Sequence, residues 1–198
     1  MESGQSLAAL LDELVGALEV KGHHVRQHLQ PGLSRSRLLE KTAALPFAFP
    51  EDLMALYMWR NGQPEAAAWD ADALCFRDNT FISVERALDA YVRQYKEAEP
   101  WDSLDRYGVA LHSCFPFAAF EGAQYVIVCG PHRLKTAEPS PIVSIFHGID
   151  LYFYSLQSMV STCIAWVRDP HWTKESHLGL REDIEMKIWQ EHNPGIFS

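Results

Sequence analysis

The sequence lacks the short motifs that mark the best-known catalytic and nucleotide-binding sites. It contains no G-x-x-x-x-G-K-[ST] phosphate loop, no G-x-G-x-x-G turn, no H-E-x-x-H zinc helix and no G-x-S-x-G elbow. No apolar run approaches the roughly 20 residues of a membrane-spanning helix. The sequence therefore gives no positive evidence of catalysis. We expect a protein that is not an enzyme, binds no cofactor or metal, and does not enter a membrane.

Cysteine and basic residues are both scarce. The four cysteines form no C-x-x-C pair and lie in apolar stretches, and the N-terminal segment has no basic leader. We expect reduced, buried thiols and a cytoplasmic protein without a secretion signal. Lys and Arg number 17 against 26 Asp and Glu, which gives a net charge of −9. This sign argues against a nucleic-acid partner, because proteins that bind nucleic acid carry basic patches.

The negative charge is concentrated in residues 65–105. This acidic segment holds ten acidic residues against four basic ones, so it carries −6 of the total −9. Such a segment suits a basic protein partner through steering and complementarity; the alternative is a solvated surface. Two tryptophans adjoin its acids, and each is either an interface anchor or a plug at the edge of the core. We predict a partner-binding site at Trp69, Asp70, Asp72, Glu97, Glu99, Trp101, Asp102 and Asp105.

Two histidine patterns suggest chemistry but have simpler interpretations. His24 and His28 are four residues apart, a spacing that would place both on one helix face as zinc ligands. Their segment, 22–34, contains no carboxylate or cysteine, which favours an exposed polar connection. His112 and Cys114 would share one face of a strand. No oxyanion hole can be named beside them, and the apolar neighbours of Cys114 favour a buried structural thiol.

Hydrophobic periodicity divides the chain into helices, then strands, then helices. Helical spacing predicts helices over 7–18, 35–44, 50–60, 84–95, 155–169 and 181–192. Short apolar runs between Gly and Pro predict a strand at 73–77 and a four-stranded antiparallel meander within 107–154. This order predicts an α+β fold, an antiparallel sheet of about four to six strands with helices packed on one face. We expect a single domain over 1–198, with 1–34 as an N-terminal helical extension and 171–198 as a C-terminal helical tail.

The stretch PEDLMALYMWRNGQ, residues 50–63, poses a choice between a ligand-lined helix and a piece of core. Pro50 suits a helix start, and the two acids that follow it meet the positive end of the helix dipole. Asn61 or Gly62 can take the left-handed conformation that ends a helix. Leu53, Leu56 and Tyr57 would share one face, which we predict to be buried.

Several short motifs occur in an order that resembles the SUKH superfamily. The opening motifs are a Leu-Pro step, a Phe-Pro-Glu-Asp-Leu helix start and an Asn-Gly stop, at residues 45–46, 49–53 and 61–62. The later ones are similar to the family's "sleea"-like helix, its "fPia..g" strand, two further strands and its closing "ySl..ml" helix, at residues 81–87, 115–122, 125–129, 141–146 and 154–160. The resemblance covers about residues 35–168.

The resemblance implies a binding scaffold without shared catalytic residues. Fungal members of the SUKH superfamily regulate cell-wall synthesis, and its bacterial members are largely immunity proteins of polymorphic-toxin systems. We therefore expect an immunity protein that binds and neutralises a toxin domain, most simply a basic one. The alternatives are a regulatory adaptor or scaffold protein and a small hydrolase with an unrecognised pocket.

Overall fold

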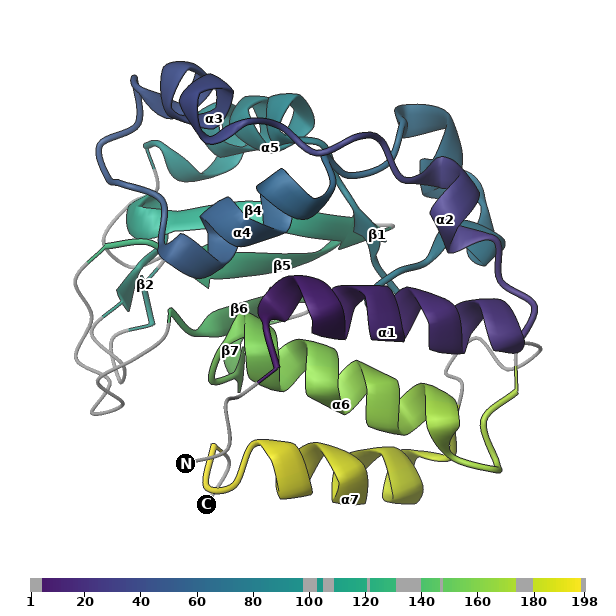
Figure 1. Cartoon of the computed structure of the whole chain (residues 1–198). Helices are drawn as coiled ribbons and strands as arrows, with labels where there is room; N and C mark the ends of the chain where they lie inside the picture. The colour runs from purple at the N-terminus through teal and green to yellow at the C-terminus, as the bar shows by residue number, and fades with distance from the viewer. Residues whose placement is uncertain are drawn as a thin grey trace.

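The fold is built on a five-stranded antiparallel sheet with strand order β1-β4-β5-β6-β7 (Figure 1). Its strands are β1 Thr80–Phe81, β4 Cys114–Phe120, β5 Ala123–Val128, β6 Ile142–Ile145 and β7 Ile149–Phe153. A separate two-stranded ladder pairs β2 Ser103–Leu104 with β3 Val109–Ala110. The computed structural model describes residues 5–97, 103–104, 109–120, 122–130, 140–146, 148–173 and 180–196, without the side chains of residues 68, 69, 71, 103 and 104.

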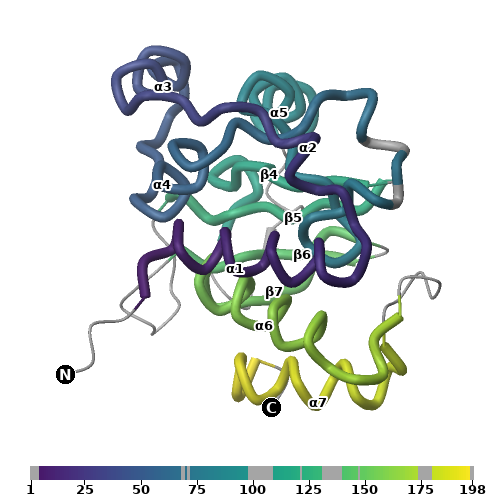
Figure 2. Tube along the Cα trace, turned by 45° about the vertical axis from the view of Figure 1, so that its right-hand side comes forward, coloured from purple at the N-terminus to yellow at the C-terminus, as the bar shows by residue number. Residues whose placement is uncertain are grey.

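Helices cover the sheet. The described part of the chain contains α1 Leu7–Val20, α2 Val25–His28, α3 Arg35–Thr42, α4 Glu51–Trp59, α5 Val84–Ala90, α6 Leu156–Arg168 and α7 Glu182–His192. A π-helical turn over Tyr91–Tyr95 continues α5. In Figures 1 and 2, α1, α4 and α6 lie across one face of the sheet, and α7 lies against α6. The predicted α+β class, with an antiparallel sheet and helices on it, is confirmed.

Serine side chains begin several of these helices. Ser6, Ser34, Ser83 and Ser155 each accept a hydrogen bond from a backbone N–H in the first turn of the helix that follows. Ser155 and Ser158 form a reciprocal capping box at the start of α6. These contacts satisfy N–H groups that have no partner within the helix. Local chemistry therefore sets the helix starts.

The face of α4 is core. Leu53, Leu56 and Tyr57 are each 0% exposed, as predicted. The Tyr57 ring lies 5.3 Å from that of Phe81 in β1, centroid to centroid, and its hydroxyl donates to the Ile82 carbonyl at 3.3 Å. The apolar face of α4 therefore packs directly on the sheet at β1, and this face is core rather than a ligand-binding surface.

The predicted strand at 73–77 is wrong. Residues Ala71–Ala73 form a 3-10 turn, and Phe76 and Asn79 form an isolated antiparallel bridge around a tight turn. At the tip of that turn Arg77 has a φ of 53°, in the left-handed region that few residues other than glycine adopt. The extended backbone begins only at β1, which pairs with β4. The turn directs Arg77 toward the C-terminal part of the chain.

Candidate functional site: a pocket at Arg77 and Glu185

The residues predicted to bind a partner fall only partly within the described structure. Trp69 ends a 3-10 turn over Glu65–Trp69, but its side chain is outside the described set. Glu97 is exposed and follows the π-helical turn. Glu99, Trp101, Asp102 and Asp105 lie outside the described residues. Among those that are described, the structure brings Asp70 and Asp72 together.

Asp70 and Asp72 are held against the segment that contains α2. Asp70 Oδ1 accepts a hydrogen bond from the Asp72 N–H at 2.9 Å, and Asp70 Oδ2 lies 3.5 Å from His28 Nε2. The His24 N–H donates to the Asp72 carbonyl at 3.1 Å. His28 thus faces a carboxylate. Within the described ranges, no group of three or more His, Cys, Asp or Glu is placed to hold a metal ion.

The thiol of Cys114 is a buried part of the core. Cys114 is fully buried, and burial raises its pKa to about 12, so the thiol is protonated near neutral pH. Its Sγ lies 3.7 Å from the Ala110 carbonyl oxygen. His112 is exposed, and its carbonyl accepts a hydrogen bond from the Tyr91 hydroxyl at 2.9 Å. The pair therefore lacks the thiolate that nucleophilic catalysis requires.

A pocket of about 330 Å³ lies between the 76–79 turn, β7 and α7. This volume is at the small end of ligand pockets, which span ~300–1,000 Å³. Its lining combines charged, aromatic and thioether side chains. They are Arg77, Tyr152, Glu182, Glu185, Met186 and Trp189.

A buried ion pair between Arg77 and Glu185 is the polar centre of this pocket. Arg77 Nε lies 2.6 Å from Glu185 Oε1, and a terminal nitrogen donates to Glu185 Oε2 at 3.1 Å. Arg77 Nε also lies 3.2 Å from Asp78 Oδ2, and the other terminal nitrogen donates to the Tyr152 hydroxyl at 3.1 Å. The guanidinium carbon lies 5.6 Å from the ring centroid of Trp166, within cation–π range. Each charge depends on the others, because an isolated buried ion is costly.

The environment shifts the pKa of the glutamate toward neutrality. Burial raises the pKa of Glu185 to about 7, Arg77 opposes the rise, and the charges of Asp78 and Glu182 add to it. The residue is 7% exposed. Burial acts to lower the pKa of Arg77, but nearby tyrosine and carboxyl groups outweigh burial and raise it, so the guanidinium stays charged. The cluster is therefore a fixed cation beside a carboxyl group that can titrate near pH 7.

Aromatic rings form the rigid wall of the pocket. The Tyr152 ring lies 5.6 Å from that of Trp189 and 6.1 Å from that of Tyr125, centroid to centroid. The Trp189 Nε1–H donates to the Tyr152 carbonyl at 2.9 Å, and the Trp166 Nε1–H donates to the Glu185 carbonyl at 3.0 Å. These two indole hydrogen bonds fasten α7 to β7 and to α6. The position of Glu185 is therefore set by packing on both sides.

Sequence reasoning missed this pocket. The helix over 181–192 was predicted, but Glu185 was not distinguished from the other acids in it. A signal was present, since Glu185 precedes Trp189 by four residues and so shares its face. These two are the buried residues of α7. Arg77 was missed as a pocket residue because residues 73–77 were predicted to form a strand.

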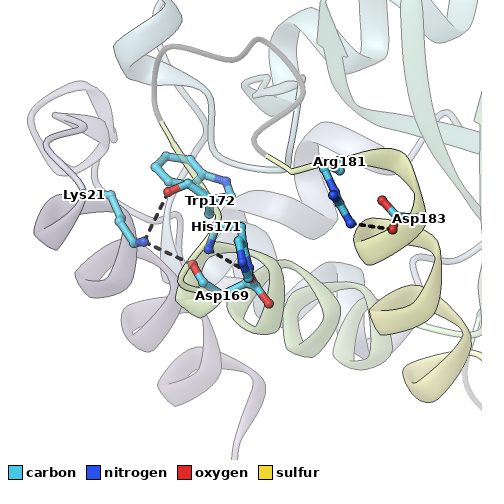
Figure 3. Close-up of polar contacts among 6 residues, drawn as sticks. All are labelled: Lys21, Asp169, His171, Trp172, Arg181 and Asp183. Atoms are coloured by element: carbon cyan, nitrogen blue, oxygen red, sulfur yellow. Dashed lines mark hydrogen bonds and ion pairs between the residues drawn. The ribbon is translucent and has the colours of Figure 1, made fainter.

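A second polar cluster lies where α1 ends beside the end of α6 (Figure 3). Lys21 Nζ donates to the carbonyls of Asp169 and Trp172 at 3.3 and 3.5 Å, and lies 5.4 Å from the Trp172 ring centroid. The His171 N–H donates to Asp169 Oδ1 at 2.8 Å, and this bond lowers the pKa of Asp169. A lysine at the carbonyl end of a helix satisfies acceptors that lack a donor within it. This cluster is a structural clamp between two helices.

Comparison with known proteins assigns no family to the chain. A scan against protein-family models and a search of curated proteins both found no match. The SUKH resemblance therefore stays a prediction. In the part of the chain that the structure describes, no helix is both long enough and apolar enough to cross a bilayer.

Proposed function

We propose that this protein is a non-catalytic protein-binding module that neutralises a basic toxin domain, as an immunity protein does. The observation that carries the proposal is the uneven negative charge, with −6 of −9 in the acidic segment, residues 65–105. Within this segment the Asp70 carboxylate faces His28 and accepts the Asp72 N–H, and the Asp72 backbone carbonyl accepts the His24 N–H. A carboxylate that is already fixed, as that of Asp70 is, loses little conformational entropy when a partner binds. The α+β scaffold also agrees with what the SUKH resemblance implies.

Inhibition on this proposal is steric and electrostatic. The acidic segment attracts the basic domain and orients it, which speeds association. A few buried anchors then slow dissociation, as hot spots do in tight complexes. No bond is made or broken, and the toxin is inactive while its working surface is covered.

The test combines identification of the partner with binding kinetics. The chain is used to capture partners from its native host, and mass spectrometry identifies a candidate toxin. Association rates are then measured at two salt concentrations for the triple variant Asp70→Asn, Asp72→Asn, Glu97→Gln. We expect slower association and a weaker salt dependence than for the unmodified chain. The charge-matched control is Glu40→Gln, Asp183→Asn, Glu191→Gln, which removes three exposed acids outside the segment. Equal rates for the two triple variants would place the interface elsewhere.

The two alternatives predict other results. A regulatory adaptor would capture cellular proteins that have no toxic activity. The hydrolase alternative has a concrete candidate in the pocket, where a carboxyl group with a pKa near 7 has the poise of a general acid or base. Both oxygens of Glu185, however, face the guanidinium of Arg77. A carboxylate held in this way is poorly placed to accept a proton from a substrate, and protein binding remains our proposal.

A further inference from the structure

We propose that the pocket between the 76–79 turn, β7 and α7 binds the cationic side chain of a lysine or arginine from a protein partner. This inference rests on the proposed function in one respect, namely that the partner is a basic protein. It adds a specific recognition pocket, with a named ligand chemistry, to a function that otherwise depends on a diffuse surface charge.

Charge is the first argument for a cationic ligand. The pocket and its immediate neighbour Asp78 carry three carboxyl groups against the single guanidinium of Arg77. Arg77 is already engaged by Glu185 and Asp78. Glu182 is exposed, and within the described residues its carboxylate makes no ion pair or hydrogen bond. The pocket thus has an excess of negative charge that its own cation does not balance.

The walls supply the second argument. Aromatic faces attract cations; the half-buried Tyr152 lines the pocket, and its ring packs on that of Trp189, which lines the pocket too but is only 1% exposed. The same cluster already holds one guanidinium, since Arg77 lies over Trp166 while it contacts Glu185. Met186 is 36% exposed beside them, and a flexible thioether adapts to the stem of a long side chain. A guanidinium or ammonium group on an alkyl stem fits these surroundings.

Other ligand classes fit less well. An anion would meet three carboxyl groups and an arginine whose two terminal nitrogens already donate to Glu185 and Tyr152. A purely apolar group would leave the Glu182 and Glu185 carboxyl groups facing a nonpolar surface, which is unfavourable without compensating hydrogen bonds. A cationic side chain pairs with the exposed Glu182 carboxylate and lies against the half-buried Tyr152 ring at the same time.

The experiment titrates the chain of residues 1–198, labelled with ¹⁵N, with small probes that each carry one side chain. The probes are N-acetyl-arginine N-methylamide, the lysine equivalent, and the citrulline equivalent, an uncharged isostere of arginine. The readout is the indole N–H signal of Trp189 among the six tryptophans, assigned with single Trp→Phe variants. We expect the cationic probes to shift this signal with a Kd on the order of 1–10 mM, and the citrulline probe to bind at least about tenfold more weakly. Equal binding of the citrulline probe, or no shift by about 50 mM cationic probe, overturns the proposal.

A matched pair of variants separates the pocket from the general field of the protein. Glu182→Gln removes a charge that lines the pocket, and we expect it to weaken arginine-probe binding about two- to fivefold. Asp183→Asn removes the same charge from the next residue of α7, whose carboxylate is paired with Arg181 at 2.8 Å (Figure 3). It should change the affinity less than about 1.5-fold. Equal weakening by both variants would show that the probe senses only the overall charge.

A last probe distinguishes a protein side chain from a free amine. Agmatine carries the same guanidinium group on a short amine chain without a peptide backbone. On our proposal the blocked arginine probe binds within about tenfold of agmatine, whereas a stronger preference for agmatine would assign the pocket to a small amine instead. None of these titrations uses the toxin. Failure here therefore leaves the kinetic test of the acidic segment intact, and failure of that test leaves these titrations unaffected.

Discussion

Arg77 Nε lies 2.6 Å from the carboxylate of Glu185, although 108 residues separate the two in the chain. The contact joins the turn before β1 to the last helix. It accounts for two unusual local choices, an arginine with left-handed backbone and a glutamate on the buried face of a helix. Such choices persist where the surrounding structure holds them in place. The pair therefore links the fold to the pocket that we assign to a cationic ligand.

Removing one member of this pair should destabilise the fold more than removing both. Arg77→Met leaves Glu185 buried without its cation, and we expect a loss of ~3 kcal/mol in the free energy of unfolding at pH 7.5. Glu185→Met should cost a similar amount. The double variant replaces both charges with apolar side chains of comparable size and should lie within ~1 kcal/mol of the unmodified chain. Denaturant titration measures all four proteins. Additive losses in the double variant would mean that the two residues act independently.

The raised pKa of Glu185 predicts a pH dependence of stability with a definite sign. The folded pKa of about 7 exceeds the ordinary value of 4.5, so the folded state retains a proton that the unfolded state releases. The associated stability is present in full below pH 4.5 and is lost as the pH rises to 7, with a limit of about 3 kcal/mol. Glu185→Gln abolishes this contribution. Between pH 4.5 and pH 7 the unfolding free energy of the unmodified chain should therefore fall relative to that of Glu185→Gln. A difference between the two proteins that does not change with pH would contradict the raised pKa.

Gly62 should tolerate no side chain. Its φ is 68°, and a Cβ atom there would lie 2.4 Å from the backbone carbon of Ile82 and from the backbone nitrogen of Ser83. We expect Gly62→Ala to destabilise by about 3 kcal/mol through combined strain and overpacking. Gly22 is the matched control, because it has a φ of 89° but nothing within 4 Å of a Cβ atom. Gly22→Ala should cost only the conformational part, about 1 kcal/mol. Equal melting-temperature shifts for the two variants would rule out the close approach at Gly62.

Leu56 should behave as a core residue. It is 0% exposed on α4, so Leu56→Ala removes packed methyl groups and leaves a cavity, with an expected loss of ~2–5 kcal/mol. Leu39 on α3 is 52% exposed, and Leu39→Ala should change stability by no more than about 0.5 kcal/mol. Urea denaturation compares the two. A loss below about 1 kcal/mol for Leu56→Ala would mean that the face of α4 is not tightly packed.

The Asn61-Gly62-Gln63 stretch shows how far a sequence signal can be trusted. The sequence predicts that Asn61 or Gly62 ends the helix in the left-handed conformation, but α4 ends at Trp59 with an extended Arg60 as its cap, and the left-handed Gly62 lies beyond that cap. The structure gives the stretch a different role, since Asn61 Oδ1 accepts the Val84 N–H and Gln63 Oε1 accepts the Phe81 N–H. Asn61 and Gln63 thereby hold the start of α5 and β1 in place. Their partners lie about twenty residues along the chain, beyond the range of a local pattern.

Local chemistry by itself determined most of the elements of this protein. Helical periodicity, serine caps and the change to short apolar runs near residue 107 depend on neighbours within a few positions, and the sequence prints those neighbours directly. Tertiary structure alone decided that residues 73–77 form no strand and that the chain turns at 76–79, because the left-handed Arg77 is held by Glu185 and Tyr152 from the other end of the chain. The pocket also depends on tertiary structure, because its lining residues come from distant parts of the chain. A buried charge is tolerated only where its partner lies, and that partner is chosen by packing rather than by sequence distance.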